Sequence, residues 1–446
     1  MKIFLAILLN AALLALLLPW LLRQWRWAGP RWWRLALVGG MALRLGLGIA
    51  RNWTPKLDAA FMSNLSQQVT AQLWAAPASA FNTLTQAVTI IRIQNEAGAD
   101  YQAVYQGLSN TWFLIKLLAL LNFGSLGIGA INGFYLSLFA FVGCWQLVRK
   151  LAEVLPGTPA GAGVVAFLLW PSVWFWSTGI SKEAVLLGSG AWLTARIVEQ
   201  LYDRARPVAK PIWRQLRWWL GTIVLAFVHF KMRYFFAVPL LGVLAAVALL
   251  AGLKQINVVQ ARWAQVAVLA AVLATGVWLA PLISRGFTAN KFTNQVIKVY
   301  TFEAYHSAGK PHFEYPALRP TIESFVAHAP LAVANTLTRP WLGESRLPMY
   351  VVAGLENALL LGLLLLAVIG VGRGRGGCLP FELGLGLAIF CLILAFLIGL
   401  TTPNLGSLNR YRSELMPFLV LLLLQNDYAA AWLRRVELGG PPTAGL

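Results

Sequence analysis

The segment that decides the fold lies near the C-terminus, where residues 404–418 read NLGSLNRYRSELMPF. It follows the apolar segment 378–400 and leads into a second apolar segment, 413–433. A helix that crosses a lipid bilayer needs about 20 mainly apolar residues, and both segments have that length and composition. The polar turn with Arg410 and Arg412 is therefore predicted to connect two membrane helices.

The composition of the whole chain also indicates a membrane protein. The chain has 446 residues, of which 59% are hydrophobic and 12% are charged, whereas soluble domains are roughly half apolar and about a quarter charged. The formal net charge of +20 does not indicate nucleic-acid binding, because the basic residues lie in short loops between apolar segments. We expect membrane lipids, and not nucleic acid, among the partners.

Further apolar segments predict an all-α, polytopic transmembrane bundle of about 11 spans that forms one integral-membrane domain, 1–446. The predicted spans are 3–22, 35–50, 125–147, 161–179, 184–201, 217–230, 232–252, 263–284, 348–371, 378–400 and 413–433. The apolar segment 111–123 is short and contains Lys116, and making it a span would export most of the basic loop residues. With the N-terminus outside and 111–123 at the surface, the short cytoplasmic loops carry the Arg and Lys residues, as the positive-inside rule requires.

The first apolar segment resembles a signal peptide, but no small-residue cleavage site follows it, so we expect a retained helix. Cys144, Cys378 and Cys391 lie in or beside apolar segments without metal-ligand spacing, and we interpret them as packing residues.

Two long connections are predicted on the outer side, residues 51–124 and 285–347. Connections of this length in a compact protein are usually functional or disordered. The first contains amphipathic stretches from Phe61 to Leu73 and from Phe81 to Ile93, and both connections are rich in aromatic residues. We therefore expect ordered helices at the membrane surface.

Unusual polar residues gather on this predicted outer side, although their positions were not used to assign the topology. Ionisable residues at the membrane edge are costly and are hypotheses for function. The set comprises Asp58, Lys182, Glu183, Lys231, Arg233, Arg339, Glu344, Arg410, Tyr411 and Arg412.

Each group also has a simpler interpretation. Asp58 can be a solvated or capping residue, Lys182–Glu183 can be a helix-start pair, and Lys231–Arg233 can be an external turn that snorkels. Arg410 and Arg412 are harder to explain in this way, because two guanidinium groups on the outer side oppose the charge bias of the chain. Arginine also suits bidentate recognition of phosphate.

A metal site is a weaker alternative. His306, His312, Glu303 and Glu314 share one outer connection, but their spacing matches no recognised ligand pattern. We expect no metal and no other cofactor, with a divalent metal as the alternative.

The acidic residue Asp58 soon after a membrane helix, the amphipathic segment 59–124 behind it, and Arg410-Tyr411-Arg412 with Pro417 before a late helix form one layout. This layout resembles the GT-C class of integral-membrane glycosyltransferases. The segment 171–183, PSVWFWSTGISKE, is similar to a feature of polysaccharide-assembly membrane enzymes. The acidic pair often found in the class is absent, because Asp58 is flanked by Leu57 and Ala59. That absence argues against metal-assisted chemistry.

The resemblance implies transfer of a sugar from a polyprenyl-phosphate donor to a hydroxyl of a glycan, lipid or protein acceptor. A lone carboxylate such as Asp58 can act as the general base, and fixed cations can stabilise the departing lipid phosphate. The expected phosphate-binding residues are Arg410 and Arg412, supported by Arg339, Arg233 and Lys182. Glu183 is a further expected substrate-binding residue. The sugar needs a polar and aromatic pocket, for which Trp174, Trp176, Tyr411 and Trp341 are available.

Two other functions remain open at this point. A polysaccharide polymerase or ligase would use the same chemistry on a glycan linked to lipid pyrophosphate. A lipid or oligosaccharide transporter ranks third, since the chain shows no internal repeat and its charges concentrate at one interface. The expected location is a bacterial inner membrane, with the active face periplasmic or extracellular.

Overall fold

The computed structural model describes residues 1–29, 31–86, 88–94, 100–203, 211–283, 287–436 and 438. Its elements follow one another along the chain as α1 (Lys2–Ala28), α2 (Arg31–Arg51), α3 (Asp58–Ala75), α4 (Pro77–Thr85), β1 (Val88–Gln94), β2 (Asp100–Gln106), α5 (Asn110–Ser125) and α6 (Gly129–Val154). Next come α7 (Ala160–Val164), η1 (Val165–Leu169), α8 (Pro171–Trp176), α9 (Lys182–Tyr202), α10 (Ile212–Met232), α11 (Tyr234–Gln255), α12 (Arg262–Ile283) and α13 (Ala289–Tyr305). The last elements are α14 (Ile322–Thr338), α15 (Pro348–Gly372), α16 (Phe381–Thr401), α17 (Leu405–Tyr411), η3 (Arg412–Glu414), α18 (Met416–Leu423) and α19 (Asp427–Arg435).

The protein is a predominantly helical membrane protein, as predicted. Seven described helices are long and apolar enough to cross a membrane: α1, α2, α6, α11, α12, α15 and α16. The pair α18 and α19 adds an eighth if it forms one span, although the two helices meet at 94°. These helices do not establish the predicted count of 11 spans. The predicted span 161–179 is divided among α7, η1 and α8.

The break in this predicted span has a local cause. Residues Val165–Leu169 form a π-helix, and Trp170 is extended before Pro171 opens α8. A proline has no N–H and is tolerated at the first turn of a helix, so Pro171 begins a new helix instead of continuing the old one. The carbonyl of Phe167 accepts a 2.7 Å hydrogen bond from the fully buried guanidinium of Arg44. Arg44 thus stabilises the irregular backbone from inside the bundle.

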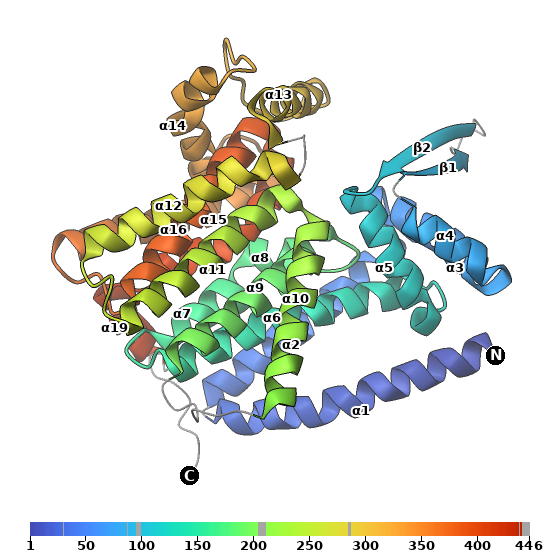
Figure 1. Ribbon diagram of the computed structural model, residues 1–446, viewed down its shortest axis with the longest axis horizontal. Helices are drawn as coiled ribbons and strands as arrows, with labels where there is room; N and C mark the ends of the chain where they lie inside the picture. Colours follow the sequence, from blue (N-terminus) through green and yellow to red (C-terminus); the bar gives the residue numbers. More distant parts are fainter. Residues whose placement is uncertain are drawn as a thin grey trace.

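The contact between α6 and α9 lies inside the bundle (Figure 1), and α2 also packs along α6. Glycine permits the closest approach: a Cβ atom added to Gly143 of α6 would lie 2.0 Å from the carbonyl oxygen of Gly188 on α9. Small residues let helix backbones approach in this way inside membrane proteins. The largest buried apolar cluster extends from here to α16 and α18, through side chains such as Phe167, Phe390 and Phe418.

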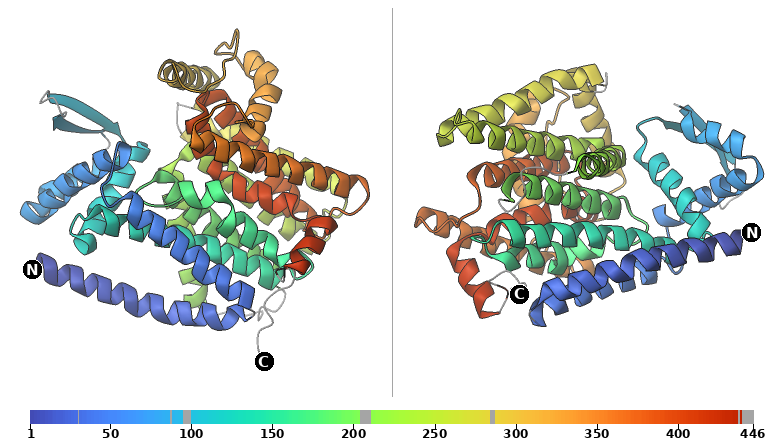
Figure 2. Two further views of the ribbon diagram at one scale, coloured as in Figure 1. Left: turned by 180° about the vertical axis from the view of Figure 1, so that it is seen from behind. Right: turned by 60° about the horizontal axis from the view of Figure 1, so that its bottom comes forward.

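The segment 51–124 contains helices at one end of the bundle, beside the N-terminus of α1 (Figures 1 and 2). The stretch from Phe61 to Leu73 lies in α3, as expected. The expectation of a helix from Phe81 to Ile93 is wrong beyond Thr85, because residues 88–94 form β1, which pairs antiparallel with β2. The run VTIIRI is rich in β-branched residues, which favour strands. In the described part of the segment 285–347, α13 and α14 are helical.

Candidate functional site

The fully buried carboxylate of Glu183 is the centre of the predicted site. Arg410 donates to it twice, from Nε to Oε1 at 3.0 Å and from Nη2 to Oε2 at 3.1 Å. Arg233 donates from Nη2 to Oε1 at 2.9 Å. Such charge-assisted, bidentate bonds are the strong ones, and they offset the cost of burying the carboxylate. Three residues from distant parts of the sequence therefore form one ion-pair cluster.

A tight turn before α9 places Glu183 at this position. Gly179 has a φ of 74° and donates its N–H to Ser137 Oγ at 2.8 Å, while the next N–H, of Ile180, is bonded to Asn52 Oδ1 at 3.3 Å. A Cβ atom on residue 179 would lie 2.0 Å from Asn52 Nδ2. Only glycine fits both the positive φ and the close approach. The turn thus holds the start of α9 against the end of α2.

Asp58 joins the cluster from the other side of Arg410. It is the first residue of α3, its side chain is 78% exposed, and its Oδ2 lies 3.6 Å from Arg410 Nη1. Glu183 raises the pKa of Arg410, which therefore keeps its positive charge between the two carboxylates. The structure thus brings together two predicted residues, Asp58 and Arg410, that are 410 − 58 = 352 positions apart.

Lys182 and Tyr411 complete the group next to a cavity. The ammonium of Lys182 donates to Asn110 Oδ1 at 3.0 Å and to Thr111 Oγ1 at 2.8 Å, both at the start of α5. The guanidinium carbon of Arg233 lies 4.3 Å from the centroid of the Tyr411 ring. This is a cation–π contact, which orients Arg233 beside Glu183.

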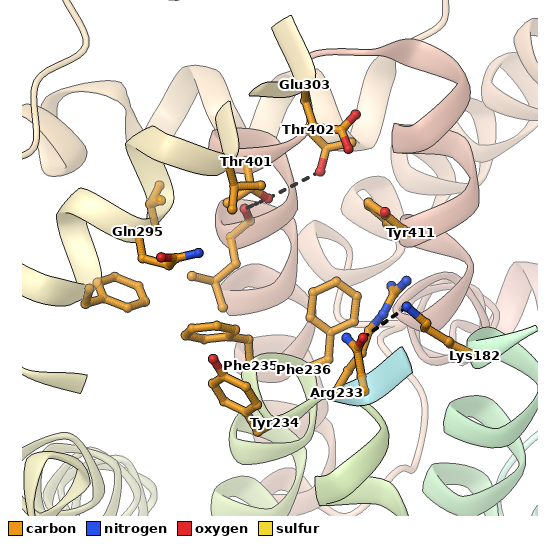
Figure 3. Close-up of a pocket in the computed structure, with 15 residues that line it drawn as sticks. Lys182, Arg233, Tyr234, Phe235, Phe236, Gln295, Glu303, Thr401, Thr402 and Tyr411 are labelled. Carbon is orange, nitrogen blue, oxygen red and sulfur yellow. Dashed lines mark hydrogen bonds between the residues drawn. The ribbon is translucent and has the colours of Figure 1, made fainter. Parts of the chain in front are cut away.

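The cavity has a volume of about 240 Å³ and lies between α9, α11, α13, α16 and α17 (Figure 3). Figure 3 shows Lys182, Arg233 and Tyr411 on one side of it and Gln295 on the other. Aromatic side chains of α11, among them Phe235 and Phe236, form an apolar part of the wall. The remaining polar lining comes from Asn110, Tyr234, Glu303, Thr401 and Thr402.

The charges around the cavity favour an anionic ligand. Arg51, at the end of α2, interacts electrostatically with both Arg410 and Glu183, which makes it a fourth cation beside Arg410, Arg233 and Lys182. Four cations against the carboxylates Asp58 and Glu183, which pair with Arg410, leave an excess of two positive charges. The buried Glu414 also interacts electrostatically with Glu183 and Arg233, and it is not included in this count. Glu303 lines the same cavity, and burial raises the pKa of its carboxyl group. When Glu303 is ionised, the excess falls to one positive charge.

Two predicted phosphate-binding arginines have other contacts. Arg412 is fully buried and donates from Nε to Asn409 Oδ1 at 3.1 Å and from Nη1 to the carbonyl of Arg339 at 2.7 Å. Arg339 pairs with Glu344 at 3.2 Å, and its guanidinium carbon lies 4.6 Å from the Trp341 ring centroid. Neither side chain lines the cavity, and Arg410 does not line it either, but Arg410 pairs with Glu183 together with Arg233, which does line it.

None of the three tryptophans predicted for the sugar pocket lines the cavity, and two of them, Trp174 and Trp176, belong to α8. Trp176 packs edge-on against Phe175 with ring centroids 4.9 Å apart, and the Trp174 ring centroid lies 6.4 Å from that of Phe175. The guanidinium carbon of Arg51 lies 4.8 Å from the Phe175 centroid and 5.8 Å from that of Trp176. These aromatic residues therefore adjoin the cluster through Arg51.

Sequence reasoning missed Arg51, Asn110 and Glu303 as members of this site. Arg51 could have been predicted as a site residue, because it follows a predicted span on the same predicted side of the membrane as Asp58. Asn110 and Glu303 had none, because single polar residues in long connections are common. Only the packing of α5 and α13 against the bundle places them at the cavity.

Among the described residues, no group of three or more His, Cys, Asp or Glu side chains is arranged to hold a metal ion. His312 lies 3.3 Å from Glu314, whereas His306 bonds to the carbonyl of Phe302. The absence of a metal or other cofactor stays a prediction.

No protein-family model, curated protein sequence or solved structure matches this chain.

Proposed function

We propose that this protein is a membrane glycosyltransferase that moves a sugar from a polyprenyl-phosphate donor to an acceptor hydroxyl. The observation that carries the proposal is Arg410, which bridges the exposed carboxylate of Asp58 and the buried carboxylate of Glu183. The excess of cations beside an adjoining cavity supports an anionic, phosphate-bearing donor. The aromatic wall of that cavity suits a ligand that is apolar over part of its surface.

In the proposed reaction, the acceptor oxygen attacks the anomeric carbon of the donor sugar. A new glycosidic C–O bond forms while the bond between the anomeric carbon and the phosphate oxygen breaks. Asp58 takes the proton of the acceptor hydroxyl, and the electron pair of the broken bond leaves on the lipid phosphate. Arg410, Arg233 and Lys182 stabilise the charge that develops on this phosphate.

The proposal includes the full membrane arrangement. The chain crosses a bacterial inner membrane 11 times. The helices α3, α13 and α14 and the strands β1 and β2 lie on the periplasmic side. Its support is the charge pattern: Arg149 and Lys150 at the end of α6, and Arg434 and Arg435 at the end of α19, then lie in the cytoplasm. The donor enters from the lipid with its head group at the Arg410 end.

A polysaccharide polymerase or ligase that uses a lipid-pyrophosphate-linked glycan is the second candidate, because a pyrophosphate carries more negative charge to the same cations. The openness of Asp58 to solvent favours a large acceptor in either case.

The test is turnover of polyprenyl-phosphate-linked sugars by the purified protein in nanodiscs, with a panel of glycan, lipid and peptide acceptors. Wild type and Asp58→Asn are compared, with Asp427→Asn as the matched control, since Asp427 opens α19 at a distant point of the chain. We expect Asp58→Asn to keep donor binding and to lose at least 100-fold in turnover, the lower end of the usual contribution of a general base (about 10²–10⁴-fold).

Equal turnover in wild type and Asp58→Asn would remove Asp58 from the mechanism. Binding of the donor by all three proteins, without turnover of any acceptor, would contradict the transferase and favour transport.

A further inference from the structure

The first helix lies at the edge of the bundle in both views of Figure 2 and is attached to it mainly by α5 and α2. Its face toward the bundle carries residues at helical spacing, namely Asn10, Leu13, Leu17, Trp20 and Gln24. The first and last of these are polar and the three between them are apolar. The two polar residues can therefore hydrogen-bond α1 to the bundle at two places, and the part of α1 between them is apolar.

Both attachments are hydrogen-bonded. At one end, Asn10 donates to the carbonyl of Gly124 at 2.9 Å and accepts from the Tyr135 hydroxyl at 2.7 Å. At the other end, Gln24 accepts from Trp145 Nε1 at 3.0 Å and from Arg149 at 3.2 Å. Such hydrogen bonds are favourable where water is scarce, and they fix both ends of this part of α1 to the bundle, next to α6.

Between α1 and α6 lies an apolar groove of about 670 Å³. Leu13, Leu17 and Trp20 line it from α1, and Leu138 and Phe139 line it from α6. From Leu9 to Trp20 the α1 side is about 16 Å long at 1.5 Å per residue, close to half of a bilayer core about 30 Å thick. The groove therefore has the length of one leaflet.

The lining of the groove and its tied walls decide what fits in it. The side chains that α1 contributes are uncharged and almost all aliphatic, namely Leu9, Leu13, Leu16, Leu17 and Trp20. The ties at Asn10 and Gln24 also prevent α1 from moving aside for a partner helix. A single acyl chain fits without such movement.

A second cavity, of about 340 Å³, lies at the N-terminal end of α1, where Lys2 and Ile3 line it. Neighbouring residues of α5 line the two spaces, since Asn122 and Phe123 face this cavity and Leu120, Leu121 and Gly124 face the groove. Its lining is more polar and includes Lys2, Gln67 and Thr70, with no carboxylate among the lining residues. The ammonium of Lys2 lies 5.7 Å from the centroid of the Trp74 ring. A cation beside a tryptophan is typical of a site for lipid head groups at a membrane interface.

We infer that these two spaces form one binding site for a glycerophospholipid, with its phosphate beside Lys2 and one acyl chain under α1. The site is separate from the Arg410 cluster and does not depend on the proposed transferase activity. The lipid fills the groove that α1 and α6 leave between them and stays bound when the surrounding membrane lipids are removed.

The test is native mass spectrometry of the full-length protein after extraction and extensive washing in detergent. We expect wild type to retain one phospholipid. Leu13→Trp with Leu17→Trp fills the groove and should lower the retained fraction at least fivefold. Leu14→Trp with Leu18→Trp is the matched control, because these leucines lie on the outward face, 51% and 55% exposed, and should leave retention unchanged.

Two further measurements keep the test independent of folding defects in the groove variant. In washed wild type loaded with a phospholipid that bears a photoreactive acyl chain, cross-links should fall on Leu13, Leu17 or Leu138. Lys2→Gln should reduce the preference for phosphatidylglycerol over phosphatidylcholine. Absence of retained phospholipid in wild type, equal retention in both double variants, or cross-links confined to Leu14 and Leu18 would each overturn the inference.

Discussion

Arg410 and Arg412 are two positions apart in the sequence, but their guanidinium groups have different surroundings. Arg410 is partly exposed and lies between two carboxylates, Asp58 and Glu183. Arg412 is fully buried, and two of its nitrogens donate to Asn409 and to the carbonyl of Arg339. At the scale of single residues, the first arginine is suited to an incoming anion and the second to holding α14 and α17 together.

Replacing each arginine by glutamine should separate these roles. Arg410→Gln should weaken binding of a polyprenyl phosphate at least tenfold, about 1.4 kcal/mol, because one of the cations next to the cavity is lost. Arg412→Gln should leave that affinity within about twofold but lower the free energy of unfolding by about 1–3 kcal/mol, since the Arg339 carbonyl loses its donor. Ligand titration and thermal unfolding in detergent measure the two effects. Equal losses of affinity would contradict the assignment.

Glu303 predicts how binding depends on pH. Burial raises the pKa of its carboxyl group, so this group becomes neutral at a higher pH than an ordinary glutamate does. As the pH falls through that pKa, the cavity loses a negative charge, and a phosphodiester ligand, whose own charge is constant, should bind more tightly. Affinity should therefore rise as the pH falls through the raised pKa of Glu303, and Glu303→Gln should remove this part of the rise. Burial lowers the pKa of Lys182, which also lines the cavity, to about 8, so the gain of affinity at the alkaline end of the profile should remain in both proteins.

Glu314→Gln is the control for this titration, because the Glu314 side chain is 75% exposed and does not line the cavity. A pH profile that is unchanged in Glu303→Gln would assign the effect to another group.

The sequence allowed some of these residues to be predicted and not others. Asp58, Lys182, Glu183, Arg233 and Arg410 were predicted as one group because the alternation of spans and the basic loops place them on one side. Arg412 and Arg339 share that side, but sequence alone cannot tell an arginine that pairs with the buried carboxylate of Glu183 from one that bonds to a backbone carbonyl. That difference depends on side-chain direction, which only packing determines.

At the scale of elements, long apolar periodicity predicted the helices well and failed where the backbone is irregular. The helices α1, α2, α11, α15 and α16 match predicted spans. The residues of strand β1 were predicted as part of an amphipathic helix. Their pattern of apolar and polar residues was taken for amphipathicity, although the run of β-branched residues favours a strand. The break at Trp170 was missed because the proline lies inside an apolar segment long enough to cross the membrane.

The contact between α6 and α9 gives the sharpest prediction for an element. Gly143→Ala places a methyl group against the Gly188 carbonyl, so the two helices must separate. We expect a loss of about 1–3 kcal/mol in the free energy of unfolding, the usual cost of overpacking. Gly276→Ala is the control, because a Cβ atom there meets nothing within 4 Å and should be neutral or slightly stabilising. Thermal unfolding of both variants measures this, and equal stabilities would contradict the close packing.

At the scale of the whole molecule, the fold brings residues 58, 183, 233 and 410 into one cluster at one end of the bundle. Several helices must meet there, and the turn at Gly179 and the start of α3 orient the acidic residues toward Arg410. The long apolar helices and the side on which these residues lie were predictable, whereas the contacts that join the four side chains depend on tertiary packing.

The proposed orientation can be tested with cysteines. Cys378 is exposed between α15 and α16, which the proposal places in the cytoplasm, and it should resist a membrane-impermeant maleimide in intact spheroplasts. In a Cys378→Ser background, Trp53→Cys should react with the maleimide. Residue 53 is 75% exposed and follows the C-terminal end of α2, which the proposal places on the periplasmic side. Reaction of Cys378 and protection of residue 53 would reverse the topology.

The central claim, that the cations beside Glu183 hold a lipid phosphate, is tested most directly by a cryo-electron microscopy map of the protein in nanodiscs with a polyprenyl-phosphate sugar. We predict phosphate density within hydrogen-bond distance of at least two of Arg410, Arg233 and Lys182, with the sugar extending toward Asp58. Phosphate density at another position, while Arg410 and Arg233 still pair with Glu183 and no ligand lies beside them, would contradict the claim.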